Sequence, residues 1–340
     1  MKAVIVNEPG SVSLGEKEAP RPDAGEVLVR MLYVGFCGSD LSTYLGKNPM
    51  VRYPRVPGHE ISGIIEEMGP GVPEEWQLGD RVTVVPYTSC GECASCRRGR
   101  FNACRNNQTL GVQRDGAMQE YISIPYEKVL KAPGLNAEEL VMVEPLTVGF
   151  HAIDRGQVEA SDVVMVLGCG MIGAGAIAGA LKRGATVIAV DVDDYKLDLA
   201  RKLGAQHAIN STRENLHEAL MKLTGGEGPD VVIEAAGNPV TYRAAVDEVA
   251  FTGRVVCIGY AGIDVSFATK LFVQKEMDIR GSRNASPDDF RQVIAYLGQG
   301  TFPLEDMITR IVKPGEAGAA LEEWAEEPGK VMKIIIDFKP

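Results

Sequence analysis

Residues 162–173 read DVVMVLGCGMIG, and this short run decides the fold of the domain around it. An unbroken apolar stretch leads directly into three glycines spaced G-x-G-x-x-G. A strand that is buried on both faces of a parallel sheet has this near-continuous apolar character. The small residues at 174–181 fit a helix packed closely on such a sheet. The run therefore predicts the first strand, turn and helix of a Rossmann-type fold.

A second strand is expected at 186–190, and Asp191 closes it, 23 residues beyond Gly168. This is close to the separation at which a carboxylate accepts hydrogen bonds from the ribose of a dinucleotide. The glycines let the backbone approach the pyrophosphate, and the helix N-terminus supplies positive potential. Because the carboxylate would repel a ribose phosphate, NAD is favoured over NADP. The expected cofactor-binding residues are Gly168, Gly170, Met171, Ile172, Gly173 and Asp191. For Met171 and Ile172 the alternative is ordinary core packing.

The alternation of strand and helix continues beyond this unit. Apolar strands are expected at 230–234, 253–258 and 277–280, each followed by small residues. In a doubly wound parallel sheet the nicotinamide ring lies along the carboxyl ends of such strands. We therefore add Ala236, Ile258 and Ser282 to the expected cofactor-binding residues.

Four cysteines form the strongest local motif. Cys90, Cys93, Cys96 and Cys104 are spaced C-x2-C-x2-C-x7-C, and four thiolates close the tetrahedral shell of a structural zinc. An iron–sulfur cluster is the other interpretation, but ferredoxins have a shorter last gap followed by proline. Four arginines lie in or beside this loop, and they either offset the thiolate charge or form a solvated rim: Arg97, Arg98, Arg100 and Arg105.

A second set of metal donors lies between residues 37 and 60. Cys37, His59 and Glu60 bring a thiol, an imidazole and a carboxylate, each close to a glycine. Three protein ligands with one open position are typical of a catalytic zinc. Glu144 stands in an apolar neighbourhood before a proline, where a carboxylate is costly unless it is paired or bound to a metal. It is expected to be a ligand, a carboxylate behind the ligands, or a dipole-stabilised residue at a helix N-terminus.

Composition limits the remaining possibilities. The chain of 340 residues favours about two domains, and 46 acidic against 35 basic side chains give a net charge of −11. Such an acidic protein gains little from nucleic-acid phosphates. No apolar run reaches the roughly 18 residues that span a bilayer, and the N-terminus turns polar too early for a signal peptide. Seven cysteines, an odd and clustered set, disfavour a secreted disulfide framework, so a cytoplasmic location is expected.

The N-terminal part differs from the central one. Short strands at 2–6, 26–34, 61–68 and 81–86 are separated by glycine and proline turns, which predicts a β-rich, barrel-like domain. After Pro287 two helices and the apolar run 330–336 follow, and we place this tail back on the first domain. The expected fold class is therefore α/β, with a β-rich domain beside a doubly wound parallel sheet.

Taken together, these motifs resemble the zinc-dependent medium-chain dehydrogenases, especially their polyol branch of sorbitol and threonine dehydrogenases. The resemblance covers essentially the whole chain and implies a GroES-like catalytic domain at 1–148 and 286–340, interrupted by an NAD-binding Rossmann domain at 149–285. It implies two zinc ions per chain. The catalytic zinc is held by Cys37, His59 and Glu60 with Glu144 as an alternating ligand, and the structural zinc by the four cysteines. Family members are homodimers or homotetramers.

A narrower resemblance concerns the substrate. The stretch GKNPMVRYPR at 46–55 is similar to one in bacterial sugar-acid dehydrogenases that act on L-galactonate or L-gulonate. Arg283 matches a substrate-binding arginine of polyol enzymes, and arginine grips a carboxylate bidentately. Ser42 stands where many relatives have a histidine of the proton relay, so Ser39, Tyr44 or a water held by a glutamate could carry the proton.

We therefore expect a zinc- and NAD-dependent alcohol dehydrogenase that moves hydride from a secondary hydroxyl of a sugar acid or polyol. The expected catalytic residues are Cys37, Ser39, His59, Glu60 and Glu144, and the expected substrate residues are Tyr44 and Arg283. A sorbitol- or xylitol-type polyol or L-threonine is the alternative substrate. A catalytically silent nucleotide-binding scaffold is the non-enzyme alternative.

Overall fold

The computed structural model describes residues 1–340, which divide into two compact units. The split unit comprises Met1–Glu144 and Ser286–Pro340, and the central unit comprises Pro145–Ala285. Each unit has its own sheet and its own apolar core. None of the helices combines the length and the apolar character needed to cross a membrane.

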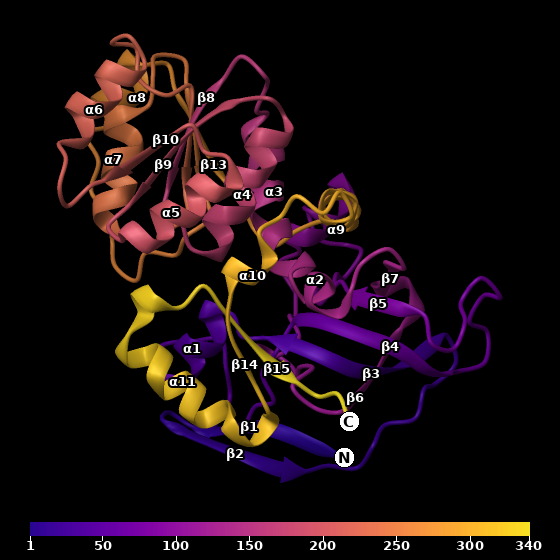
Figure 1. Ribbon diagram of the computed structural model, residues 1–340. Coiled ribbons are helices and arrows are strands. Elements are labelled where there is room, and N and C mark those ends of the chain that lie inside the picture. Colours follow the sequence, from indigo (N-terminus) through magenta and orange to yellow (C-terminus); the bar gives the residue numbers. More distant parts are fainter. The chain divides into compact units, whose positions relative to one another are not determined.

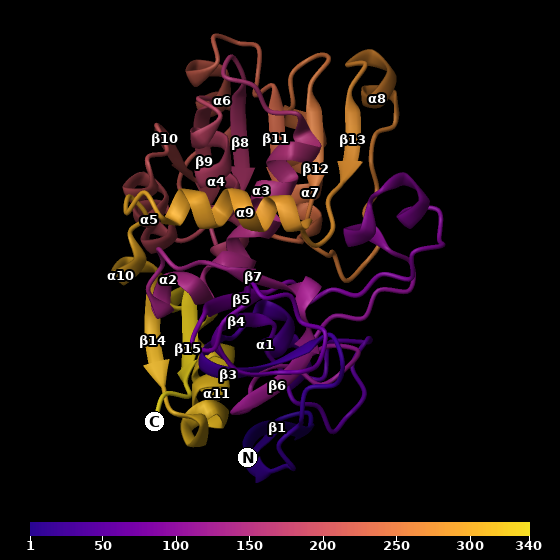
Figure 2. The ribbon, with the colours of Figure 1, turned by 90° about the vertical axis from the view of Figure 1, so that its right-hand side faces the viewer.

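The central unit is built on a parallel sheet of six strands in the order β10-β9-β8-β11-β12-β13, which Figure 2 shows side by side. Counted from the first strand this is the order 3-2-1-4-5-6 of a doubly wound fold, which confirms the fold class expected from residues 162–173. The strands are β8 (Val163–Leu167), β9 (Thr186–Asp191), β10 (His207–Asn210), β11 (Val231–Glu234), β12 (Arg254–Cys257) and β13 (Asp278–Gly281).

Helices cover both faces of this sheet, because alternate side chains of the same strands enter two separate apolar clusters. The helices are α3 (Val143–Gly156), α4 (Met171–Lys182), α5 (Asp194–Leu203), α6 (Leu216–Leu223), α7 (Pro239–Glu248) and α8 (Lys270–Gln274). Asp193, Asn215 and Asn238 cap the N-termini of α5, α6 and α7 with side-chain oxygens. Helix α4 packs closely on α3, since a Cβ at Gly149 would lie 2.2 Å from the Ala176 nitrogen.

The split unit contains a second, mostly antiparallel sheet in the order β14-β15-β3-β4-β5-β7, with β6 also paired to β3 (Figure 1). A two-stranded hairpin, β1–β2, stands apart from this sheet. The strands are β1 (Lys2–Glu8), β2 (Ser11–Glu16), β3 (Glu26–Gly35), β4 (Glu60–Met68), β5 (Arg81–Val84), β6 (Tyr121–Pro125), β7 (Val129–Lys131), β14 (Ile308–Val312) and β15 (Lys333–Asp337).

Short helices complete the split unit, and Figure 1 shows α11 beside the β1–β2 hairpin and helix α1. The α-helices are α1 (Gly38–Tyr44), α2 (Ala137–Val141), α9 (Pro287–Leu297), α10 (Leu304–Met307) and α11 (Ala317–Glu326). Single 3-10 turns occur at η1 (Cys96–Arg98), η2 (Phe101–Ala103), η3 (Tyr126–Lys128), η4 (Pro314–Glu316) and η5 (Pro328–Lys330).

Strand pairing brings distant donor residues to one end of this sheet. The last residue of β3, Gly35, pairs with the first residue of β4, Glu60, because the two strands run antiparallel. Gly35 also pairs with Ile335 of β15. Cys37, which follows β3, therefore lies near His59 and near the beginning of β15.

Candidate active site

The four cysteines form a compact lobe at residues 90–104. Their ligand atoms all lie within 4.8 Å of one another. The Cys93 sulfur is 3.4 Å from that of Cys96 and 3.9 Å from that of Cys104, and the sulfurs of Cys104 and Cys90 are 3.6 Å apart. Zn–S bonds of about 2.3 Å place the sulfurs of a tetrahedron about 3.8 Å apart. The lobe therefore fits a structural zinc ion.

Local hydrogen bonds lower the pKa of Cys90 and Cys93, whereas burial raises the pKa of Cys96 to about 11. A side-chain hydrogen bond to Ser95, followed by backbone N–H groups, lowers the pKa of Cys93 to about 5. Backbone N–H groups of Cys90 and Asn106 also donate to the Cys104 sulfur, both at 3.3 Å. All four arginines of the lobe are exposed, in agreement with a solvated rim: Arg97, Arg98, Arg100 and Arg105.

Helix α1 presents Cys37 at its N-terminus. The Cys37 N–H donates to the Asp40 carboxylate at 2.9 Å, which closes a capping box at the first turn. Asp40 is 1% exposed, and burial raises its pKa although His59 and backbone N–H groups act in the opposite direction. The buried hydroxyl of Ser39 has no hydrogen-bond partner. Asp40, which sequence reasoning missed, thus accepts from the Cys37 backbone and interacts electrostatically with His59.

His59 is almost fully buried beside these groups. Burial alone would lower its pKa, but the pKa is raised well above the usual value because Cys37, Asp40 and Glu144 favour the charged imidazolium. The Nδ1 atom is buried without a hydrogen-bond partner. A cation would meet a sulfur and a nitrogen donor here, as zinc requires.

Glu60 is held by a lysine that sequence reasoning did not identify. Both Glu60 carboxylate oxygens lie 2.6 Å from the Nζ of Lys333, and the same Nζ donates to the Phe36 carbonyl at 2.9 Å. Both side chains are almost inaccessible to solvent. Burial raises the pKa of Glu60 to about 7, while Lys333 acts to lower it. The available signal was a lysine within the apolar run that ends the chain.

Glu144 has a different partner. It is the second residue of α3 and accepts a hydrogen bond from the Tyr87 hydroxyl, and both side chains are buried. Burial, and then the charge of Glu144, raises the pKa of Tyr87 well above its usual value, so the phenol stays protonated. The charges of Cys37 and Glu144 act on His59, and those of Glu144 and His59 act on Glu60, so the four side chains lie near one another. Their donor types are those of a catalytic zinc, but their ligand atoms do not form a set within 4.8 Å of one another, as those of the cysteine lobe do.

The glycine loop after β8 has the backbone geometry of a phosphate-binding turn. Gly168 has a φ of 92°, which favours glycine, and a Cβ at Gly173 would lie 1.9 Å from the Gly168 carbonyl oxygen. The Asp191 carboxylate accepts from the Cys169 N–H at 2.7 Å, so the end of β9 fixes this loop. Gly170 caps α4, whose first residues are Met171 and Ile172.

The other expected cofactor residues follow neighbouring strands of the same sheet. Ala236, Ile258 and Ser282 come after β11, β12 and β13, at the carboxyl edge. The N–H groups of Ala236 and Ile258 both donate to Glu234, and the Ser282 N–H donates to Cys257. The Ser282 hydroxyl is buried without a partner. Arg283 follows directly and is half-buried in the central unit.

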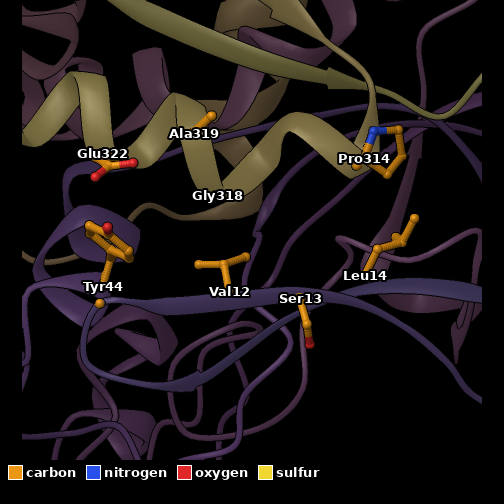
Figure 3. Close-up of a pocket in the computed structure, with 10 residues that line it drawn as sticks. Val12, Ser13, Leu14, Tyr44, Pro314, Gly318, Ala319 and Glu322 are labelled. Carbon is orange, nitrogen blue, oxygen red and sulfur yellow. The ribbon is translucent and has the colours of Figure 1, made fainter.

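Tyr44 lies at the opposite end of α1 from Cys37 and lines a cavity of about 310 Å³ (Figure 3). Residues of β2 and α11, among them Val12 and Glu322, form the other walls, and none of the expected metal ligands does.

The substrate-like stretch at 46–55 is largely tied to helix α1. Asn48 donates to the Thr43 hydroxyl at 3.3 Å, and the Tyr53 hydroxyl donates to the Thr43 carbonyl. Arg55 pairs with Asp115 at 3.0 Å, and Arg52 is exposed.

Comparison with known proteins defines the class. Residues 23–134 match the alcohol dehydrogenase GroES-like domain, and residues 172–299 match the zinc-binding dehydrogenase domain. The chain therefore belongs to the zinc-type alcohol dehydrogenase family, and the expected resemblance and GroES-like domain are confirmed.

Individual relatives cover nearly the whole chain. An uncharacterized zinc-type alcohol dehydrogenase-like protein of Haemophilus influenzae is 33% identical over 99% of both chains. The L-galactonate-5-dehydrogenase of Escherichia coli is 32% identical over 99% of both. The crystal structure of the alcohol dehydrogenase rspB of Escherichia coli CFT073, complexed with NADH, has a TM-score of 0.91 at 32% identity, again over 99% of both chains.

Proposed function

We propose that this protein is a zinc- and NAD-dependent dehydrogenase that moves hydride from a secondary hydroxyl of a sugar acid or polyol to NAD. The observation that carries the proposal is the group of half-buried Cys37 with buried His59 and Glu144, in a chain that also has a dinucleotide-type glycine loop. Of the expected donors, Glu60 is paired with Lys333, so Glu60 contributes mainly to the charge around the site.

The proposed catalytic roles follow from the contacts. A zinc ion held by Cys37, His59 and one glutamate would lower the pKa of the substrate hydroxyl. Asp40 orients His59 electrostatically from behind. Ser39 is the proposed first member of the proton relay, because its buried hydroxyl has no competing partner. It would accept the substrate proton while it passes its own proton on to solvent water.

The cofactor proposal rests on the central unit. Gly168, Gly170 and Gly173 would admit the pyrophosphate at the start of α4, and Asp191 would hold the ribose. The NADH complex of the Escherichia coli CFT073 relative supports this choice. A relative from Sinorhizobium meliloti is bound to NADP, so cofactor preference is a direct test of the Asp191 argument.

The substrate proposal is an L-galactonate- or L-gulonate-like sugar acid, with Arg283 gripping the carboxylate. The L-galactonate-5-dehydrogenase relative supports it. Sorbitol dehydrogenases and an L-threonine 3-dehydrogenase are comparably similar, and they support the alternative substrates.

The deciding experiment combines metal analysis with a screen of NAD reduction against aldonates, neutral polyols and L-threonine. We expect two zinc ions per chain, turnover of an aldonate, and a larger rise in KM for the aldonate than for a polyol in Arg283→Ala. Comparable sorbitol turnover with no aldonate turnover would reject the carboxylate grip. A folded, metal-replete protein with zinc in the cysteine lobe alone would reject the mechanism and favour a nucleotide-binding scaffold.

We also propose a homodimer or homotetramer in the cytoplasm. The edge strand β13 supports self-association, because Asp278, Ile279 and Gly281 are exposed and its outer side is unpaired in the chain. Light scattering of the purified protein tests the oligomeric state, and a monomer would contradict it.

A further inference from the structure

Tyr87 belongs to none of the motifs that point to the active site, yet its hydroxyl donates directly to the Glu144 carboxylate. Tyr87 is 5% exposed and Glu144 is 3% exposed. A buried carboxylate is costly unless donors satisfy it, so this hydrogen bond contributes strongly to where the Glu144 oxygens lie.

The backbone around Tyr87 is fixed from three sides. Tyr87 pairs with Thr109 in an antiparallel bridge, and the Leu110 N–H donates to the Pro86 carbonyl at 3.0 Å. The Lys128 Nζ donates to the Tyr87 carbonyl at 2.8 Å. One residue further, the Thr88 hydroxyl accepts from the Gln108 N–H at 2.7 Å. The phenol is thus carried by a rigid stem, and its hydroxyl has a defined direction.

This stem is also the base of the cysteine lobe. Residues 86–88 lead into Cys90, and residues 108–110 return from Cys104, so the two paired segments close the lobe. The lobe and the Glu144 carboxylate are therefore connected through one side chain.

The two glutamates near His59 are held by chemically different partners. Lys333 contacts both oxygens of Glu60 with a positive charge, which competes directly with a metal ion for that carboxylate. Tyr87 offers Glu144 one neutral donor, directed at Oε1, and brings no positive charge of its own to that carboxylate.

We propose that Tyr87 is a positioning residue, which orients the Glu144 carboxylate toward a cation held by Cys37 and His59. This inference rests on the proposed function, because it assumes a zinc ion at that group. Tyr87 acts through Glu144 and does not itself touch the substrate. Partners that orient a metal-ligating group change metal affinity by about 10–100-fold when they are removed.

The test measures metal binding in the full-length protein. Tyr87→Phe removes only the hydroxyl, and competition with a chelator gives the zinc affinity of each site. We expect the zinc at the Cys37–His59 site to bind about 10–100-fold more weakly than in the wild type, with the affinity of the cysteine lobe unchanged. With Co²⁺ in the Cys37–His59 site, we expect the visible absorption bands to change in position and intensity.

Tyr33→Phe is the matched control. The Tyr33 hydroxyl donates to Glu138 at 2.6 Å and also accepts from Lys339, so this variant removes a tyrosine–glutamate hydrogen bond in the same unit. Neither residue is among the expected metal ligands. We expect its zinc affinities and cobalt spectrum to match those of the wild type.

A second comparison tests whether Tyr87 acts through the glutamate. In a Glu144→Gln background, Tyr87→Phe should have less than a twofold effect on zinc affinity, because the group that it orients is already altered. The inference is overturned if Tyr87→Phe keeps the wild-type affinity and cobalt spectrum, or if its full effect persists in the Glu144→Gln background. A wild-type protein that holds both ions but oxidises no alcohol would refute the proposed function and leave the Tyr87 result standing.

Discussion

The split unit contains two sets of metal donors that are built in opposite ways. The cysteine lobe takes all its ligands from one short segment, residues 90–104, and its sulfurs already have tetrahedral spacing. The Cys37–His59–Glu144 group takes its donors from the end of β3, the start of β4 and the start of α3. Tyr87 holds the carboxylate of Glu144, and Lys333 holds that of the neighbouring Glu60; both partners belong to still other segments.

Under the proposed function, the difference separates a site that stabilises the fold from a site that reacts. A closed shell of four thiolates leaves no position for a substrate, whereas three ligands of mixed type leave one. An open site of this kind requires buried charged groups. Burying them is energetically unfavourable unless neighbouring residues orient and neutralise them. The following changes, from the largest expected effect to the smallest, test whether the two sets are independent.

Replacing Cys37 by alanine should have the largest effect on catalysis. Metal activation supplies several kcal/mol to the barrier, and each 1.36 kcal/mol is a factor of ten, so turnover should fall at least about a thousandfold. Metal analysis should give one zinc per chain, and NAD affinity measured by fluorescence should be unchanged. Wild-type turnover in this variant would end the zinc mechanism.

Replacing Cys93 by serine should affect mainly stability. The variant should lose the lobe zinc, and its melting temperature should fall because a structural zinc contributes folding free energy. Limited proteolysis should cut within residues 90–104. If Tyr87 connects the lobe to Glu144, the remaining zinc should also be held more weakly, and equal retention in variant and wild type would show that the two sites are independent.

Replacing Lys333 by methionine tests the buried pair with Glu60. An unpaired buried carboxylate should cost about 3–5 kcal/mol in the free energy of unfolding. Adding Glu60→Gln should recover much of this loss, because the uncompensated charge is then gone. Chemical denaturation of the single and double variants measures both values, and a double variant as unstable as Lys333→Met alone would contradict the pairing argument.

Replacing Ser95 by alanine should have the smallest effect. Its hydroxyl lies 3.0 Å from the Cys93 sulfur, and the net contribution of a typical hydrogen bond is about 0.5–1.5 kcal/mol. The lobe should hold zinc about two- to tenfold more weakly, with turnover unchanged. A loss as large as that in Cys93→Ser would mean that the four sulfurs are not the main source of affinity.

The sequence was informative where function depends on local spacing. The Cys90–Cys104 spacing and the run at 162–173 each belong to one continuous segment, so the lobe and the first strand–turn–helix of the central unit could be predicted directly. The roles of Lys333 and Tyr87 could not be predicted from the sequence. Lys333 contacts Glu60, and Tyr87 contacts Glu144, only after segments far apart in the chain have paired. The stretch at 46–55 was linked to the substrate by resemblance alone. In the structure, Asn48 and Tyr53 from this stretch form hydrogen bonds with Thr43 of helix α1.

Stepwise removal of zinc by a chelator, with turnover and metal content followed together, tests the central claim most directly. An open site exchanges its ion more readily than a closed shell of four thiolates. We predict two phases: the first zinc leaves together with all activity, and the second leaves later with loss of structure. Activity that survives the first phase and disappears only with the second zinc would contradict the assignment of catalysis to Cys37, His59 and Glu144.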